Sequence, residues 1–188
     1  MDDPALSPDL HDAALEGLAR LNRVAGADIG FREPLARLLD AHDGGPVRLL
    51  DLATGSADLP VRLDRWLGRS RPALERRWNG VDISEHALRR AEARARAAGL
   101  AFHSCRVDVL ENELPPCDIA MCSLFLHHLD DEQAVTAIRR LDASARIGVI
   151  VGDLRRTRLG LILADIFPTT AAAREEDLRI AESREAVV

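Results

Sequence analysis

The stretch Val47–Pro60, VRLLDLATGSADLP, decides the fold, because a buried strand passes there into a helix through a short acidic turn. Its apolar run ends at Asp51, and small residues follow until Asp58 opens a helical pattern. A turn of this kind at the carboxyl edge of a parallel sheet is typical of nucleotide-like ligand sites. Only one glycine, Gly55, lies in the turn. The sequence therefore raises the question of which ligand such a turn can hold.

The composition of the whole chain excludes several classes of protein. The 188 residues are 47% hydrophobic and 30% charged, which is typical of one soluble domain with one core. The net charge of -6 gives a polyanion no electrostatic help, so we expect no nucleic-acid partner. The three cysteines lack metal-ligand spacing, which predicts free thiols and no metal site. No signal peptide and no apolar run of about 20 residues is found, so we expect a cytoplasmic protein without a membrane span.

Strand-like and helix-like segments alternate along the chain. The predicted strands are 47–51, 78–83, 101–109, 118–123 and 145–154. The predicted helices are 9–24, 33–42, 58–67, 84–99, 130–141 and 157–167. Strands that alternate with long helices indicate βαβ units, whose crossovers are almost always right-handed. The sequence therefore predicts an α/β fold with a doubly wound, mainly parallel sheet.

Acidic side chains gather at the predicted carboxyl edge of this sheet. The five strands end at or near Asp51, Asp82, Asp108, Ser123 and Asp153. Ligands of open α/β sheets bind at this edge. A single acid there is explained by the polarity of loops, but four acids on five strands favour a ligand site.

The turn after the first strand argues against a dinucleotide. The fingerprint G-x-G-x-x-G lets the backbone approach a pyrophosphate, but from Ala53 this chain reads ATGSAD. Asp58 would repel phosphates, and Asp82 lies beyond the usual spacing of about 20 residues. A nucleotide-dependent oxidoreductase is therefore disfavoured. A ligand with adenine, ribose, an ammonium and a sulfonium, but no phosphate, suits these carboxylates; S-adenosylmethionine is such a ligand.

Four motifs, in order, then resemble one family. LLDLATGSADLP resembles motif I of the class I S-adenosylmethionine-dependent methyltransferases, and is especially similar to the D-x-A-x-G-[ST]-G-D form of the ubiquinone/menaquinone C-methyltransferase-like group. Ala57 stands where that form has its last glycine. GVDIS resembles motif II, CRVDVLENELP the adenine-facing segment, and CDIAMCSLFLHHLDD motif IV. The resemblance covers residues 47–154.

The resemblance implies a Rossmann-like methyltransferase fold that binds S-adenosylmethionine. Asp82 would bind the ribose hydroxyls, Asp108 and Val109 would face the adenine amino group, and Cys122 and Ser123 would line the methionine moiety. The implied cofactor-binding residues are Asp51, Ala53, Thr54, Gly55, Asp58, Asp82, Ile83, Asp108, Val109, Cys122 and Ser123. Residues 1–45 would form a helical lid, and residues 46–168 the cofactor-binding core.

Candidate catalytic residues follow the fourth and fifth strands. A methyl group on a sulfonium is already activated, so a base is needed only where the acceptor must lose a proton. His127 and His128 are the candidate bases, although one could simply pack inward while the other is solvated. Asp153 could orient an acceptor hydroxyl or pair with Arg155 or Arg156. The segments SLFLHHL and GDLRRTRLGLILADIF resemble methyltransferases of polyketide- or quinone-type products, which implies a small aromatic or apolar acceptor.

The end of the chain departs from the seven strands usual for this class. Only five strands are found, and residues 169–188 read as a polar tail, helical or disordered, so we expect the last two strands to be missing. An uncovered fifth strand would favour aggregation or a homodimer. A second hypothesis therefore remains open: a catalytically impaired S-adenosylmethionine-binding fold that acts as a binding or scaffold partner.

Overall fold

The computed structural model describes residues 28–154 and 178–182. The helices are α2 (Ile29–Asp40), α3 (Asp58–Ser70), α4 (Glu85–Ala97) and α5 (Asp131–Ser144), with one 3-10 turn, η1 (Leu126–His128). The strands are β1 (Val47–Leu52), β2 (Arg76–Asp82), β3 (Phe102–Arg106), β4 (Cys117–Ser123), β5 (Ala145–Leu154) and β6 (Leu178–Glu182). The predicted helices 9–24 and 157–167 lie outside the described residues. None of the helices described here is long and apolar enough to cross a membrane.

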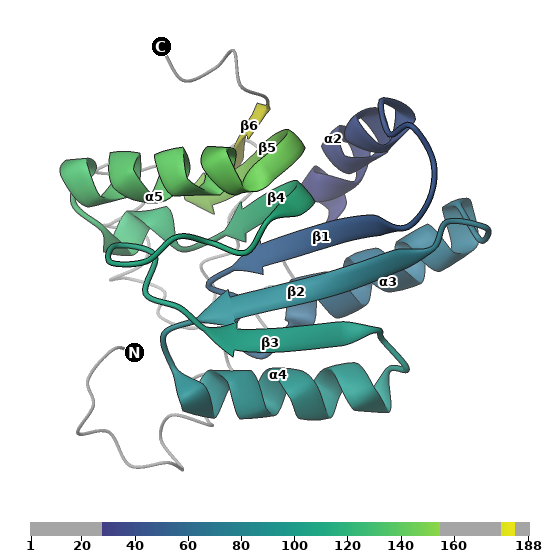
Figure 1. Ribbon diagram of the computed structural model, residues 1–188, viewed down its shortest axis with the longest axis horizontal. Helices are drawn as coiled ribbons and strands as arrows, with labels where there is room; N and C mark the ends of the chain where they lie inside the picture. The colour runs from purple at the N-terminus through teal and green to yellow at the C-terminus, as the bar shows by residue number, and fades with distance from the viewer. Residues whose placement is uncertain (1–27, 155–177, 183–188) are drawn as a thin grey trace, which may run out of the picture.

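The strands form one sheet in the order β3-β2-β1-β4-β5-β6. β1 to β5 are parallel, and the arrowheads of β1 to β4 all point to the left in Figure 1. From β1 the chain first builds outward through β2 and β3, and then returns to add β4 and β5 on the other side of β1. The strand order therefore reverses between β1 and β4, the switch point at which such sheets bind ligands. The predicted doubly wound, mainly parallel sheet is confirmed.

The two faces of the sheet carry two separate apolar clusters. Leu49 and Leu50 are neighbours in β1, so their side chains point to opposite faces, and each lies in a different cluster. α2 and α3 cover the face of Leu49, whereas α5 covers the face of Leu50. α4 packs beside α3, along β2 and β3 (Figure 1). This layering leaves the carboxyl ends of the strands for the loops that carry the candidate site.

Helix α2, which lies within the predicted lid segment, packs against the sheet. Its buried side chains Phe31, Leu35 and Leu39 recur at helical spacing and join the cluster that contains Leu49 and Ile150. The apolar face of the helix is thus packed against the sheet. A lid role within residues 1–45 remains a prediction for the part of that segment outside the described residues.

The sheet contains one strand more than the five that the sequence predicted. β6 lies within the segment expected to be a polar tail, and it pairs antiparallel with β5, from Leu178 beside Leu154 to Glu182 beside Ile150. The sequence LRIAE alternates apolar and charged residues only briefly, so it gives a weak strand pattern by itself. The open hydrogen-bonding edge of β5 provides the partner that the local sequence lacks. The expectation of an uncovered fifth strand is corrected accordingly.

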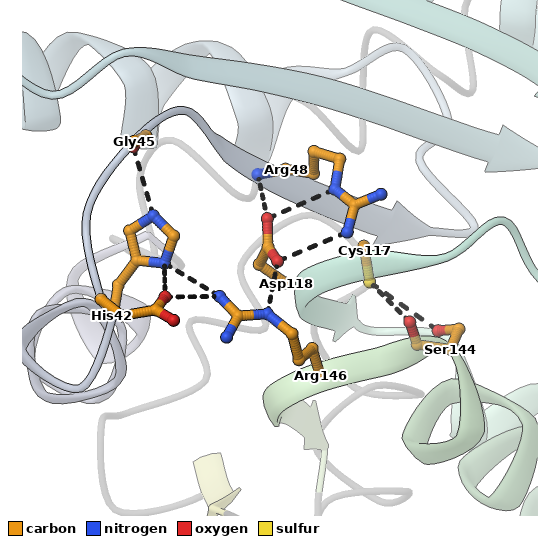
Figure 2. A network of polar contacts seen from close by, with 8 residues as sticks. His42, Gly45, Arg48, Cys117, Asp118, Ser144 and Arg146 are labelled. Carbon is orange, nitrogen blue, oxygen red and sulfur yellow. Dashed lines mark hydrogen bonds and ion pairs between the residues drawn. The ribbon is translucent and has the colours of Figure 1, made fainter.

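A polar network closes the opposite, amino-terminal edge of the sheet (Figure 2). The carboxylate of Asp118 in β4 accepts hydrogen bonds from the backbone N–H of Arg48 at 2.8 Å and from Nε of Arg146 at 3.0 Å. The register of β4 and β5 shifts at this point, between Cys117 and Ile119. Arg146 also donates to Asp43 at 3.1 Å. The buried carboxylate of Asp118 therefore links β4 to β1 and β5, and through Arg146 also to the turn before β1.

The environment of Asp118 makes this network pH-dependent. Burial alone would raise the pKa of Asp118, but the hydrogen bonds from Arg48 and Arg146 outweigh burial and lower the pKa to about 2. A carboxyl whose folded-state pKa lies below its unfolded value stabilises the fold at neutral pH. That contribution is lost as the pH falls from about 4 towards 2.

We predict that Asp118→Asn lowers the free energy of unfolding at pH 7, by an amount on the order of 1–2 kcal/mol, because the charged acceptor for two guanidinium groups is lost. Asp43→Asn is the matched control, since that exposed carboxylate pairs with the same Arg146 and should change stability little. Urea unfolding at pH 7 and pH 3 tests this. Equal stability of the wild type and Asp118→Asn at pH 7 would contradict the assignment.

Candidate functional site

The turn after β1 is built from left-handed residues. The φ angles of Ala53, Gly55 and Ala57 are +54°, +52° and +56°. For alanine this conformation costs about 1–2 kcal/mol, whereas for glycine it is nearly free. Ala57, which replaces a glycine of the motif, therefore keeps the glycine-like conformation at an energetic cost. Such strain is typical of functional turns that the surrounding structure holds in place.

The first acid of the site, Asp51, is buried at the end of β1. Its Oδ2 accepts a hydrogen bond from Oγ1 of Thr54 at 2.7 Å, and only 3% of the residue is exposed. Burial raises the pKa of Asp51 to about 7, the Thr54 hydroxyl lowers it in part, and the negative charge of Asp82 raises it further. A cation bound nearby would therefore stabilise the ionised form of this carboxyl.

The second acid, Asp82, fixes two backbone segments at once. Its Oδ2 accepts from the N–H of Gly55 and its Oδ1 from the N–H of Ser84, both at 2.9 Å. Each carboxylate oxygen has a further lone pair, so Asp82 can also accept from the two hydroxyls of a ribose. A Cβ placed on Gly55 would meet only open space, and Ile83 is 55% exposed. The ends of β1 and β2 therefore offer an open surface with an acid and an apolar side chain, which fits a nucleoside.

Gly80 is a residue of the site that the sequence analysis did not identify. A Cβ on Gly80 would lie 2.3 Å from the ring of Phe102 and 2.9 Å from Cγ2 of Thr54. The absence of a side chain thus lets Thr54 approach β2, where its backbone N–H bonds to the carbonyl of Val81 at 3.0 Å. A lone glycine inside a strand pattern, as in WNGVDI, is the signal that could have identified it.

Asp58 is engaged by protein cations. Its carboxylate lies 2.9 Å from Nη1 of Arg94 in α4 and 3.8 Å from Nη1 of Arg62 in its own helix. It therefore ties α3 to α4, a contact that the sequence does not indicate, because Arg94 lies 36 residues away. A direct role for Asp58 in holding a cationic ligand remains a prediction.

The loop after β3 carries the predicted adenine-facing residues. The carboxylate of Asp108 accepts from the N–H of Leu110, and the carbonyl of Asp108 accepts from that of Asn112, both at 2.8 Å. Val109 is buried in the cluster under α5. The structure thus places a half-buried Asp108 in a tight turn that lies beyond the end of β3.

The end of β4 differs from expectation at one residue. Cys122 is completely buried, and burial raises the pKa of its thiol well above the usual value. Its side chain thus packs in the core, whereas Ser123 is half-buried at the edge of the sheet. Leu124 follows with a φ of +52°, held by a 2.8 Å bond from its N–H to the carbonyl of Gly152. Ser123 therefore suits ligand contact better than Cys122.

The structure places the three predicted catalytic residues next to one another and pairs two of them by hydrogen bonds. Nδ1 of His127 lies 2.7 Å from Oδ1 of Asp153, and the backbone N–H of His127 donates to Oδ2 of the same carboxylate at 3.2 Å. The ring of His128 lies 4.0 Å from that of His127, and His128 is exposed. An Asp153 bonded to Nδ1 orients the imidazole so that Nε2 is the nitrogen that can exchange a proton with a substrate. Among the described residues, no cluster of three or more His, Cys, Asp or Glu could hold a metal ion.

The comparisons with known proteins agree with this geometry. A family model described as "Methyltransferase domain" matches residues 49–148. The magnesium protoporphyrin IX methyltransferase from Synechocystis PCC 6803, solved with bound SAH, is 22% identical, with a TM-score of 0.59 over 84% of this chain and 71% of that chain. A SAM-dependent methyltransferase from Aquifex aeolicus is 17% identical, with a TM-score of 0.55 over 85% of this chain and 87% of that one. No curated protein matches the chain.

The structure of the [4+2]-cyclase SpnF is also similar, with 22% identity and a TM-score of 0.50 over 62% of this chain and 42% of that chain. This chain spans only 37% and 51% of two further similar methyltransferases. The predicted methyltransferase fold and its cofactor class, S-adenosylmethionine, are confirmed at the level of the family and fold. The narrower resemblance to the ubiquinone/menaquinone group is not confirmed, and the acceptor is not shown.

We predict that Asp51→Asn stabilises the cofactor-free protein at pH 8. A carboxyl whose folded-state pKa lies above its unfolded value destabilises the fold as the pH rises through the interval between them, here from about 4 to about 7. Asparagine keeps an acceptor for Thr54 without the buried charge. The difference in free energy of unfolding between variant and wild type should grow between pH 4 and pH 8, to on the order of 2 kcal/mol. A pH-independent difference in urea midpoints, or a more stable wild type at pH 8, would refute this reading of Asp51.

Proposed function

The chain belongs to the methyltransferase domain family, and on that premise we propose that it transfers a methyl group from S-adenosylmethionine to a small aromatic or apolar acceptor. The observation that carries the proposal is the pairing of His127 with Asp153 at 2.7 Å, next to the switch point of the sheet. This pair adds a proton acceptor to the carboxyl edge of the sheet, where Asp51 and Asp82 are proposed to bind the cofactor. Such a combination favours an acceptor that loses a proton, such as a phenol or a quinol.

The residues at the ends of β1, β2 and β3 support the cofactor half of the site. Asp82 would accept the ribose hydroxyls, because the bonds from Gly55 and Ser84 already fix the orientation of its carboxylate. The exposed Ile83 would cover one face of the base, and Asp108 would accept from its amino group. Asp51 would lie under the turn as a negative charge that favours a cationic ligand. The bound cofactor would supply a methyl group that its sulfonium has already activated.

The residues at the ends of β4 and β5 would serve the acceptor. Asp153 would hold the imidazole of His127 through Nδ1, and Nε2 would take the proton that an acceptor hydroxyl loses when a methyl group replaces it. The rest of the catalysis is alignment, since an in-line approach at roughly 3 Å gives most of the rate enhancement in such transfers. Ser123 and Leu124, at the edge of β4, lie between this pair and the turn after β1 in the order of the sheet.

We predict that the protein binds S-adenosylmethionine and S-adenosylhomocysteine, and that Asp82→Asn weakens both at least tenfold, because a charged acceptor for two hydroxyls is lost. Isothermal titration calorimetry measures the two affinities. Asp64→Asn is the control, since that carboxylate pairs with Arg76 away from this edge. If the wild type gives no heat with either ligand, the proposed function fails; binding of NADH instead would favour an oxidoreductase.

We predict that His127→Gln slows methyl transfer to phenols by about 100-fold or more near neutral pH, while the affinity for S-adenosylhomocysteine is unchanged. Asp153→Asn should show a smaller loss of the same kind, since it disturbs only the orientation of the ring. The rate of His127→Gln should recover at high pH, where phenols ionise without a base. His128→Gln, at the exposed neighbour, serves for comparison. An unchanged rate in His127→Gln would remove the base from the mechanism.

One observation favours a second function that is not methyl transfer. The chain is similar in structure to a [4+2]-cyclase, and one fold can host more than one chemistry. A protein that binds S-adenosylmethionine without methylating any phenol or quinol would act as a binding or scaffold partner or catalyse another reaction. Mass spectrometry of a panel of phenols and quinols, incubated with labelled S-adenosylmethionine, separates these cases. A labelled product supports the methyltransferase, whereas binding without product favours the alternative.

A further inference from the structure

The side chain of Arg140 reaches from α5 to the loop after β3. Its Nη1 donates to the carbonyl of Val109 at 2.8 Å and to the carbonyl of Asn112 at 2.9 Å. Both acceptors are backbone groups of the turn that contains Asp108. One guanidinium nitrogen thus holds both ends of a four-residue segment, although Arg140 lies 31 residues from Val109 in the sequence.

The loop needs a support of this kind, because no helix is described between β3 and β4. Residues 107–116 cross from the outer strand of the parallel set to β4 as turn and irregular chain, and the loop lies beside α5 in Figure 1. Its own hydrogen bonds close the local turn, through the carbonyl and the carboxylate of Asp108, and at the start of the loop the N–H of Val107 bonds to the carbonyl of Asp82 in β2 at 3.1 Å. The apolar side chains of Val109 and Leu114 anchor it to the core but set no direction for its backbone. The two bonds from Arg140 are directional and charge-assisted, so they fix the turn relative to α5.

We propose that Arg140 is a positioning residue for recognition of the base, and this inference rests on the proposed function. Through Val109 and Asn112 it sets the place and tilt of the turn, and thereby the distance from Asp108 to the amino group of the adenine. A hydrogen bond to the amino group distinguishes adenine from other bases only when the acceptor is held in place. In this arrangement the guanidinium of Arg140 bonds to the backbone of the loop, and the contact to the base is assigned to Asp108. Its effect is therefore on the selectivity for the base and not on the methyl transfer step.

A purely structural role for Arg140 makes a different prediction. If the guanidinium only ties the loop to α5, its loss would lower the melting temperature but leave the selectivity for adenine unchanged. The two roles are separated by comparing S-adenosylhomocysteine with S-inosylhomocysteine, in which the amino group of the base is replaced by an oxo group. The ratio of the two dissociation constants reports on recognition of this edge of the base, where the inosyl ligand carries an oxo group and a proton on N1 in place of the amino group and the bare N1 of adenine.

The experiment measures both dissociation constants by calorimetry for the wild type, Arg140→Met and Arg140→Lys. Methionine keeps the apolar stem but no donor, whereas lysine keeps one ammonium that can reach a carbonyl. Arg139→Met is the matched control, because Arg139 is the exposed neighbour on the same helix. Titrations are made below the melting temperature of every variant, so that only folded protein is compared.

For Arg140→Met we expect about a tenfold weaker binding of S-adenosylhomocysteine and a preference over S-inosylhomocysteine that falls towards one. Arg140→Lys should recover part of that preference, and Arg139→Met should match the wild type. A wild-type preference that persists in Arg140→Met overturns the inference, as does a wild type that binds both ligands equally. A wild type that binds neither ligand overturns the proposed function, and the inference with it. Should Arg140→Met fail to fold, Arg140→Lys decides, because an unchanged preference in that variant together with weaker overall binding would assign only a structural role.

Discussion

The structure depends on the burial of β1, which is paired on both sides and covered on both faces. Every side chain of the strand except that of Arg48 is buried. A charge in the middle of such a strand would be desolvated without compensation, so polar groups can lie only at its two ends. The amino end of the strand meets the Asp118 network, and the carboxyl end meets the turn that carries the candidate site (Figures 1 and 2). The division of the molecule into a stabilising edge and a functional edge follows from this constraint.

Two buried carboxyls on neighbouring strands show how different the two edges are. Asp118 and Asp51 are 4% and 3% exposed, yet the pKa of Asp118 is lowered to about 2 and that of Asp51 is raised to about 7. Burial acts on both in the same direction, so the difference lies in their partners. Asp118 has the guanidinium groups of Arg48 and Arg146, whereas Asp51 has a neutral hydroxyl and faces another acid. The functional edge therefore carries unfavourable negative charge that a cationic ligand can relieve, and the opposite edge does not.

Much of this arrangement could be predicted from the sequence, because its main elements leave local signals. The acids Asp51 and Asp82 are predicted from residue type and spacing to lie at the carboxyl ends of two strands, and they lie within the last two residues of β1 and β2. Other features could not be predicted in this way. The pairing of Asp58 with Arg94 and the pairing of β6 with β5 depend on which elements become neighbours in space. A single sequence shows which side chains are able to pair, but it does not show which helices and strands become neighbours in the fold.

The strand order also divides the carboxyl edge of the sheet into two halves that carry different side chains. β1, β2 and β3 bring acids and an exposed apolar residue, Ile83, whereas β4 and β5 bring the pair of His127 and Asp153. The boundary runs between β1 and β4, where Ala53 and Leu124, the residues that follow these strands, both adopt left-handed backbone conformations. Strained backbone of this kind persists only where the surrounding structure holds it in place. After β1 the N–H of Thr54 bonds to the carbonyl of Val81 in β2, and after β4 the N–H of Leu124 bonds to the carbonyl of Gly152 in β5, so each turn is held by the strand that lies away from the switch point. One fold can host several chemistries on this basis, because changes in the residues that follow β4 and β5 leave those that follow β1 and β2 in place.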